Sequence, residues 1–415
     1  MKIIVQKFGG TSVASHENRL AAVKHIEGAL AEGYGVVVVV SAMGRQGDPY
    51  ATDTLLSTVG DGAVASKRDL DILMSCGEAI SSVVFASLLR SRGHDAVVLN
   101  GGQAGIVTNH QYGNARILDV RPTLILELLQ QGKIVVVMGF QGATEDGDIT
   151  TLGRGGSDTT ATALGVALCA EYVDIFTDVN GIMTADPRIV PDARILDRTT
   201  YTEICDLGYH GAKVIHPRAV ELAMQKNIPV RVRGTLSSDA GTLIANPVVT
   251  MEHTLPDSNQ QVTGITQMSN MAQIQLEDGC NGKFDVLAAM AENDIHVDLV
   301  FVNRDRMSYI LPSRDAELAV RILQERGYSP KALPNCAKVS VVRPRFTEGS
   351  DIMARMIGVL SEKAIEIHSS GDSHSVIWCL VNGPDMEKAV QALHDEFQLG
   401  QDETISIQAT PQLVG

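Results

Sequence analysis

Over residues 1–245 the chain alternates between apolar, strand-like runs and helical patterns, and this alternation constrains the fold more than any other feature. Several runs are apolar at almost every position, as is typical of parallel strands that are covered by helices on both faces. The repeated strand-helix order therefore predicts an α/β domain, a three-layer αβα sandwich around a mainly parallel sheet. The strand candidates are KIIVQKF, GVVVVVSAM, DAVVLN, KIVVVMGF, YVDIFTDV and IPVRVRG.

The remainder of the chain has a different pattern. Residues 246–262 contain two prolines and many polar residues, and we expect them to form a linker. The order strand, helix, strand, strand, helix then occurs twice, and Ile295 precedes Ile365 by roughly seventy residues, as expected of an internal repeat. We predict two α+β units of βαββαβ type, at 263–336 and 337–399, with a strand in 400–412 folding back to complete the first.

Composition excludes several classes of protein. The formal net charge of −15 argues against binding to nucleic acid, which needs a surplus of lysine and arginine. The six cysteines have no metal-ligand spacing, so we expect neither a zinc site nor disulfides. The longest apolar runs are too short to span a membrane. The first strand and its Gly-Gly turn lie where a signal peptide would need an uninterrupted apolar stretch, so we expect no signal peptide. A soluble cytoplasmic protein is therefore expected.

The segment KFGGTS, which ends the first strand, has the features of a phosphate site. Gly9 and Gly10 allow a sharp turn and close approach of a ligand to the main chain. A helix that begins near Thr11 would point its free N–H groups at that turn, and Lys7 adds a positive charge there. Because the segment matches neither a Walker A loop nor the dinucleotide fingerprint, an ordinary turn with a solvated lysine is the alternative.

A second glycine-rich helix start, GRGGSDTT, makes the phosphate interpretation stronger. Ser157 or Asp158 would cap the helix, and Arg154 can bind a carboxylate through two parallel hydrogen bonds.

Glu78 lies in a mostly apolar helical pattern, where a carboxylate is costly unless a cation meets it. Lys213 precedes a helix that starts at Pro217, and it either binds a phosphate or is a solvated cation.

Taken in order, six segments resemble the aspartate kinases (aspartokinases) of the amino acid kinase family: KFGGTS, VSAMG, SCGE, TTLGRGGSDTTA, TDVNGIMTADPR and GAKVIHPRAV. The resemblance spans nearly the whole chain, because these enzymes also carry two C-terminal ACT units that bind amino acids. It implies phosphorylation of L-aspartate to 4-phospho-L-aspartate by ATP and Mg²⁺, in the biosynthesis of lysine, diaminopimelate, threonine and methionine. Mg²⁺ would be carried by the ATP phosphates rather than by protein side chains.

The resemblance also assigns roles to residues. Lys7 and Asp158 would be catalytic. ATP would be bound by Lys7, Phe8, Gly9, Gly10, Thr177, Asp178, Asn180, Gly181, Thr184, Asp186, Arg188 and Lys213. Aspartate would be bound by Ser41, Thr52, Glu78, Arg154, Gly155, Gly156, Ser157 and Asp158.

The second half is similar to that of the diaminopimelate-sensitive isoform, so meso-diaminopimelate is the expected effector, with lysine or threonine as alternatives. Asp285 and Asp298 would meet the effector's ammonium groups, or else are simply solvated. ACT units commonly pair between subunits, which implies a homodimer. Two rival functions are a related kinase acting on glutamate, acetylglutamate or UMP, and a non-catalytic amino-acid sensor.

Overall fold

The computed structural model describes residues 1–415 except 61–63, 247–260, 278–282, 304–305, 345–348 and 401–415. Contacts divide the chain into two units, one of Met1–Ile182 with Ile195–Thr263 and one of Met183–Arg194 with Gly264–Gly415. The expected linker at 246–262 lies almost entirely outside the described residues, as does the expected strand at 400–412.

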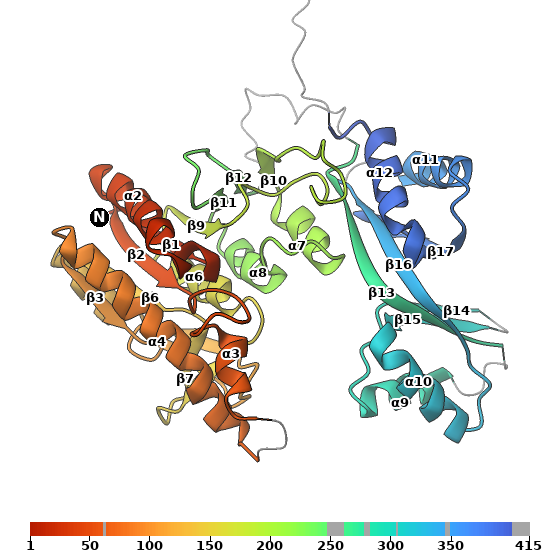
Figure 1. Cartoon of the computed structure of the whole chain (residues 1–415), viewed down its shortest axis with the longest axis horizontal. Helices are drawn as coiled ribbons and strands as arrows, with labels where there is room; N and C mark the ends of the chain where they lie inside the picture. Colours follow the sequence, from red (N-terminus) through yellow and green to blue (C-terminus); the bar gives the residue numbers. More distant parts are fainter. Residues whose placement is uncertain (61–63, 247–260, 278–282, 304–305, 345–348, 401–415) are drawn as a thin grey trace, which may run out of the picture. The chain divides into compact units, whose positions relative to one another are not determined.

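The first unit is built on an eight-stranded, mainly parallel sheet (Figure 1). Only β12 runs antiparallel to its neighbour β11. All six strands expected from the apolar runs are present, as β1, β2, β3, β6, β9 and β11. The order across the sheet is β10 (Arg198–Thr199), β12 (Thr242–Ile244), β11 (Val230–Gly234), β9 (Tyr172–Thr177), β1 (Ile3–Phe8), β2 (Gly35–Val40), β6 (Ile134–Met138) and β3 (Ala96–Leu99).

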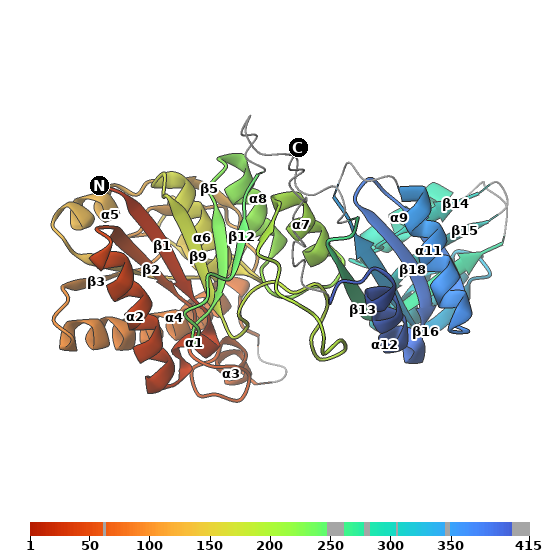
Figure 2. The same ribbon diagram turned by 90° about the horizontal axis from the view of Figure 1, so that it is seen from above.

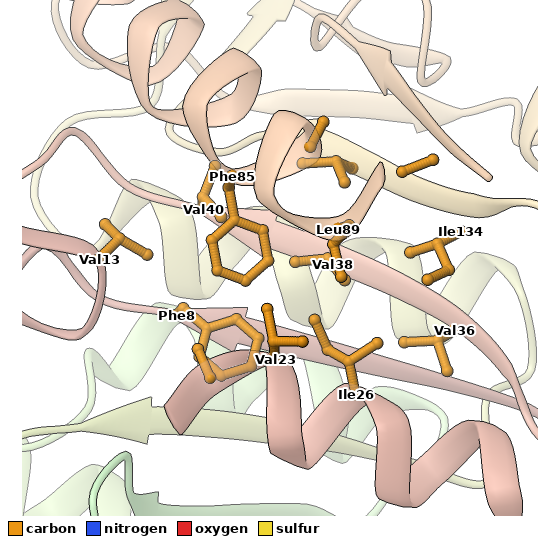
Figure 3. Packing of buried hydrophobic residues seen from close by; sticks show 14 of the residues in the cluster. Phe8, Val13, Val23, Ile26, Val36, Val38, Val40, Phe85, Leu89 and Ile134 are labelled. Carbon is orange, nitrogen blue, oxygen red and sulfur yellow. The ribbon is translucent and has the colours of Figure 1, made fainter. Parts of the chain in front are cut away.

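Helices cover both faces of this sheet, which confirms the expected αβα sandwich. On one face, Val23 and Ile26 of α2 and Phe85 and Leu89 of α4 pack against β1, β2 and β6 (Figure 3). The opposite face is covered by α5 and α6. The helices of the unit are α1 (Gly10–Ala14), α2 (His16–Ala31), α3 (Thr52–Ser57), α4 (Lys67–Ser91), α5 (Thr123–Gln130), α6 (Gly156–Ala167), α7 (Tyr201–Tyr209) and α8 (Pro217–Gln225).

A smaller four-stranded sheet in the first unit was not expected from the sequence. Its order is β5 (Ile117–Val120), β4 (Ile106–Thr108), β7 (Gln141–Ala143) and β8 (Ile149–Thr151). These strands are three or four residues long and lie in glycine-rich, polar segments, so they contain too little alternation to be recognised. The sheet matters for function because β8 leads directly into the GRGGSD segment.

The second unit contains one six-stranded antiparallel sheet with two sets of helices. The sheet order is β14 (Val300–Val302), β15 (Met307–Pro312), β13 (Gly264–Leu276), β16 (Lys331–Val342), β18 (Val376–Asn382) and β17 (Ile367–Asp372). The helices are α9 (Lys283–Glu292), α10 (Ser313–Glu325), α11 (Gly349–Glu362) and α12 (Met386–Glu396), the last preceded by a 3₁₀ turn, η2 (Gly383–Asp385). Figure 1 labels all four helices, and Figure 2 shows α9, α11 and α12 from a second direction. The order strand, helix, strand, strand, helix occurs twice, as the repeat predicted.

Two boundaries in the structure differ from those expected. β16 begins at Lys331, six residues before the expected start of the second repeat at 337, because the strand continues past Pro334 through a bulge at which Asn335 adopts φ 56°. Residues 183–194 were expected in the first domain. They lie with the second unit because Ile265 N–H donates to the Thr184 carbonyl and the Thr184 hydroxyl bonds His394.

Candidate active site

Lys7 lies near the end of β1 on the face that α6 covers. Its Nζ is 2.6 Å from Oδ1 of Asp158 in the first turn of α6, and each side chain is 11% exposed. Because side chains alternate along a strand, the next residue, Phe8, points to the opposite face. There it stacks on Phe176 and Phe85 in the core, so only its main chain is available to a ligand.

The two glycines after Phe8 have different surroundings. A Cβ on Gly10 would lie 2.6 Å from the Gly44 carbonyl oxygen and 2.8 Å from that of Ala42, so the loop after β2 leaves room only for glycine. Gly9 is less crowded, and its nearest neighbours at Cβ distance are Lys7 Nζ and the Phe176 carbonyl, both 3.5 Å away. Gly10 therefore allows the loop after β1 to pack against the loop after β2. Gly9 leaves its main chain accessible to a ligand beside the Lys7 ammonium.

The N-termini of α6 and α8 meet beside the Lys7–Asp158 ion pair. Gly155 caps α6 in the left-handed conformation, with φ 66°, and a Cβ there would lie 2.2 Å from Cβ of His216, the residue that caps α8. Nδ1 of His216 accepts a hydrogen bond from the Arg218 N–H. Burial lowers the pKa of His216, which favours the neutral ring that can accept this bond. Two positive helix ends and one ammonium thus converge on the same place.

Other residues of the GRGGSD segment surround the start of α6. Arg154 is exposed and has no ion pair or hydrogen bond among the described residues, while Ser157 and Asp158 are buried. Phe140 also belongs here and was missed from the sequence. It adopts φ 68°, donates its N–H to Thr160 Oγ1, and lies against Gly156. An aromatic residue between glycines at a strand end, GFQG, was the available signal.

Glu78 comes from α4 and is 2% exposed. Its Oε1 accepts the N–H of Ala42, whereas Oε2 is buried without a hydrogen-bond partner among the described residues. Burial raises the pKa of Glu78 to about 8. Ser41, adjacent to Ala42, and Thr52, the first residue of α3, are both half-buried. Glu78 therefore has an unused acceptor of the kind that an ammonium group would satisfy.

Three of the expected nucleotide residues, Thr177, Asp178 and Asn180, line one small pocket of about 100 Å³. Asp178 is paired with Arg45 from the loop after β2, a contact that sequence reasoning did not find. Gly181 is buried, and Lys213 is exposed on the loop that precedes α8. The other residues that line the pocket are Thr11, Ser12, Asn18, Gly234, Thr235 and Leu236.

The structure does not group the rest of the expected nucleotide residues with this pocket. Thr184, Asp186 and Arg188 belong to the second unit. Thr184 is fully buried with its hydroxyl 2.9 Å from His394 Nε2, and Asp186 pairs with Arg188 at 2.6 Å. The expected effector residues are also in the second unit, and both have protein partners. Asp285 pairs with Arg326, and Asp298 pairs with the fully buried Lys338.

Among the described residues, no group of three or more His, Cys, Asp or Glu side chains is placed to hold a metal ion.

α4 is long and apolar enough to span a membrane, but half of its most apolar window is buried in the protein. Because this helix also buries Asp71 and Glu78, its contacts are those of a core helix of the first unit.

Comparisons with known proteins identify the family of the chain. Residues 2–234 match the amino acid kinase family, and residues 331–395 match the ACT domain. The chain is 50% identical to aspartokinase 1 of Bacillus subtilis over 96% of its own length and 100% of that protein, and 39% identical to aspartokinase 2 of the same organism. The chain belongs to the aspartokinases of the amino acid kinase family.

Solved structures extend the similarity to three dimensions. Escherichia coli aspartokinase III in complex with aspartate and ADP, in the R-state, has a TM-score of 0.78 and 26% identity, over 95% of this chain and 99% of that one. The same enzyme with lysine and aspartate, in the T-state, has a TM-score of 0.73. This aspartokinase therefore phosphorylates aspartate with ATP and carries an ACT-type regulatory region, which excludes the two rival functions considered above.

Proposed function

We propose that this aspartokinase transfers the γ-phosphoryl group of ATP at the junction of Lys7 with the N-termini of α6 and α8. The observation that carries the proposal is the Lys7–Asp158 pair, whose atoms are 2.6 Å apart beside two helix starts. Negative charge spreads over the phosphoryl group during transfer, and fixed ammonium and N–H groups stabilise it there. Asp158 holds the Lys7 ammonium in place until the nucleotide arrives.

The acceptor needs orientation rather than deprotonation. The β-carboxylate of aspartate is already ionised at neutral pH, so no general base is required. Within the described parts of the chain, neither the Arg154 guanidinium nor Glu78 Oε2 has a hydrogen-bond partner. The guanidinium is suited to a carboxylate of the substrate, and Oε2 is suited to its ammonium. Ser41, Thr52 and the main chain of Gly155, Gly156 and Ser157 complete the proposed aspartate site.

For the nucleotide, we assign the phosphates to Lys7, Lys213 and the main chain of Phe8, Gly9 and Gly10. Thr177, Asp178, Asn180 and Gly181 bind the remainder of ATP in this proposal, while Thr184, Asp186 and Arg188 remain predictions. Mg²⁺ fits this chemistry as an ion carried on the phosphates, since the carboxylates near Lys7 are single rather than clustered. Bound there, it would neutralise charge on the oxygens of ATP.

Regulation by an amino acid is the next part of the proposal. The E. coli relative is described with lysine bound, and we propose meso-diaminopimelate for this chain from the resemblance in its second repeat. We assign ATP and aspartate binding to residues 1–245 and the effector to the two repeats at 263–336 and 337–399. We also propose a homodimer through the ACT units, a cytoplasmic location, and a first step toward lysine, threonine and methionine.

Replacing Lys7 tests the proposed phosphoryl-transfer site. We expect Lys7→Ala to lower kcat by roughly 10²- to 10³-fold, the scale for loss of one preorganised charged group, while the protein stays folded. Lys2→Ala is the matched control, because Lys2 precedes the same strand, is 67% exposed and pairs only at the surface with Glu171. Coupled measurement of ADP release, with circular dichroism on each variant, gives the comparison. Near-normal turnover by folded Lys7→Ala protein would refute the proposed site.

A further inference from the structure

Asp71, a buried carboxylate on α4, accepts hydrogen bonds from two loops, one of which leads into the GRGGSD segment. Asp71 is fully buried, and Oδ1 and Oδ2 accept three donors. These are the Gly113 N–H at 2.9 Å, the Thr151 N–H at 2.8 Å and the Thr151 hydroxyl at 2.7 Å. A buried carboxylate with this many bonds is strongly constrained, and so are its partners.

The segment that Asp71 holds leads straight to the proposed substrate residues. Thr151 ends β8, and Arg154 follows three residues later, after Gly153 with φ 74°. Only Leu152 and Gly153 separate Thr151 from Arg154, and Gly153 is closely packed, since a Cβ there would lie 2.8 Å from Asn114 Oδ1. The position of Arg154 therefore depends on the position in which Thr151 is held by its hydrogen bonds to Asp71.

Arg218 also joins the same two loops through its side chain. The guanidinium of Arg218, at the start of α8, donates to the Leu152 carbonyl at 3.1 Å and to the Ala115 carbonyl at 2.9 Å. The Ala115 N–H also donates to the Thr151 carbonyl at 2.8 Å. Residues 113–115 and 151–152 thus form one braced unit.

Asp71 also shares its helix with Glu78, about two turns further along α4 and hence on the same side. One rigid helix therefore fixes Glu78 directly and Arg154 through Thr151. These are the two groups that the proposed function assigns to the two ends of aspartate. Their spacing is set by a single helix, even though they come from distant parts of the chain.

We propose that Asp71 is a positioning residue for aspartate, acting through Thr151 on Arg154 without contacting substrate itself. This inference rests on the proposed substrate site. Misplacing one binding group by a fraction of an ångström weakens substrate binding without altering the groups that carry out phosphoryl transfer. The expected signature is a raised KM for aspartate, with kcat and the KM for ATP nearly unchanged.

The test uses the full-length enzyme and a pair of substitutions at Thr151. Thr151→Val keeps the shape but removes the hydroxyl bond to Asp71, and Thr151→Ser keeps the hydroxyl. We expect the KM for aspartate to rise about threefold or more in Thr151→Val and to stay near wild type in Thr151→Ser. In Asp71→Asn we expect a rise of about tenfold, since the amide cannot accept all three bonds.

A double substitution tests whether the two residues act through one interaction. Asp71→Asn with Thr151→Val should have nearly the same KM for aspartate as Asp71→Asn alone. If folded Thr151→Val and Asp71→Asn proteins both keep the wild-type KM, or lose kcat with KM unchanged, the positioning role is wrong. If Arg154→Ala leaves the KM unchanged, the proposed substrate site itself is wrong, which separates the two failures.

Discussion

The ammonium of Lys7 and the carboxylate of Asp158, 2.6 Å apart, join the end of β1 to the first turn of α6. This pair connects the two glycine-rich segments, KFGGTS and GRGGSD, which are remote in sequence. Because each side chain is 11% exposed, the pair is shielded from water, and its charges act more strongly than a surface pair would.

Substituting Asp158 separates its charge from its place in the helix. Asp158→Asn keeps a short polar side chain in the first turn of α6 but leaves the Lys7 ammonium without its partner. We expect kcat to fall roughly tenfold to a hundredfold, because the ammonium is no longer held in one position. Steady-state kinetics at saturating ATP and aspartate measure the change. An unchanged kcat would show that Lys7 is positioned by other contacts.

Arg154 is expected to act on substrate binding. Because the Arg154 guanidinium has no ion pair among the described residues, its removal leaves no buried charge and little structural cost. We expect Arg154→Ala to raise the KM for aspartate by roughly ten- to a hundredfold, as loss of one charged hydrogen-bonded contact does, with the KM for ATP unchanged. Initial rates across an aspartate series measure this. Arg314→Ala, at an arginine of the second unit whose side chain is 79% exposed and to which no binding role is assigned, is a control for loss of positive charge.

Glu78 predicts a pH dependence of substrate binding. Burial raises the pKa of Glu78 to about 8, so the carboxyl is mainly protonated at neutral pH when no substrate is bound. An ammonium group of aspartate favours the ionised form, and proton loss then accompanies binding. We expect the KM for aspartate to fall as the pH rises toward about 8 and to level off above it. In Glu78→Gln this dependence should disappear.

The same group affects stability in the absence of substrate. The folded pKa of Glu78 lies above its ordinary value of 4.5, so the folded state holds a proton that the unfolded state has lost between these two pH values. Stability contributed by Glu78 therefore decreases as the pH rises through that window. Thermal unfolding of the apo enzyme across this range should show a steeper decline for wild type than for Glu78→Gln. Parallel declines would contradict the pKa shift.

In the second unit, Lys338 is expected to matter for folding. Its ammonium is fully buried and pairs with Asp298, so Lys338→Met would leave that carboxylate without its cation. Loss of one partner from such a pair costs about 3 kcal/mol, whereas replacing both partners by uncharged groups is much less damaging. We expect urea unfolding to show a large decrease in the free energy of unfolding for Lys338→Met. Most of that free energy should be regained in the double variant Lys338→Met with Asp298→Asn. Equal losses in both would mean that Asp298 has another partner.

Local pattern predicted the fold class and the order of the larger elements of this aspartokinase, but not its smaller four-stranded sheet. Six apolar runs predicted six of the eight strands of the main sheet, all but the short β10 and β12, and the repeated order of elements predicted the two ACT-type units. Burial on both faces and strand-helix alternation leave direct traces in sequence. The glycine-rich strand ends also marked Lys7, Arg154 and Asp158, since each motif is contiguous. The roles of these residues came from resemblance to a family and await the experiments above.

Contacts between residues that are far apart in the sequence could not be predicted from local pattern. Nothing near Asp71 indicates that its carboxylate would bind Thr151 and Gly113, and nothing near Thr184 indicates that its hydroxyl would bond His394, 210 residues further along the chain. Likewise, the sequence predicted that Asp298 meets an effector ammonium or is solvated, whereas in the structure it pairs with the buried Lys338. Periodicity reports which face of an element is buried, but the partner of a buried polar group depends on how separate elements pack, and only the folded chain specifies that.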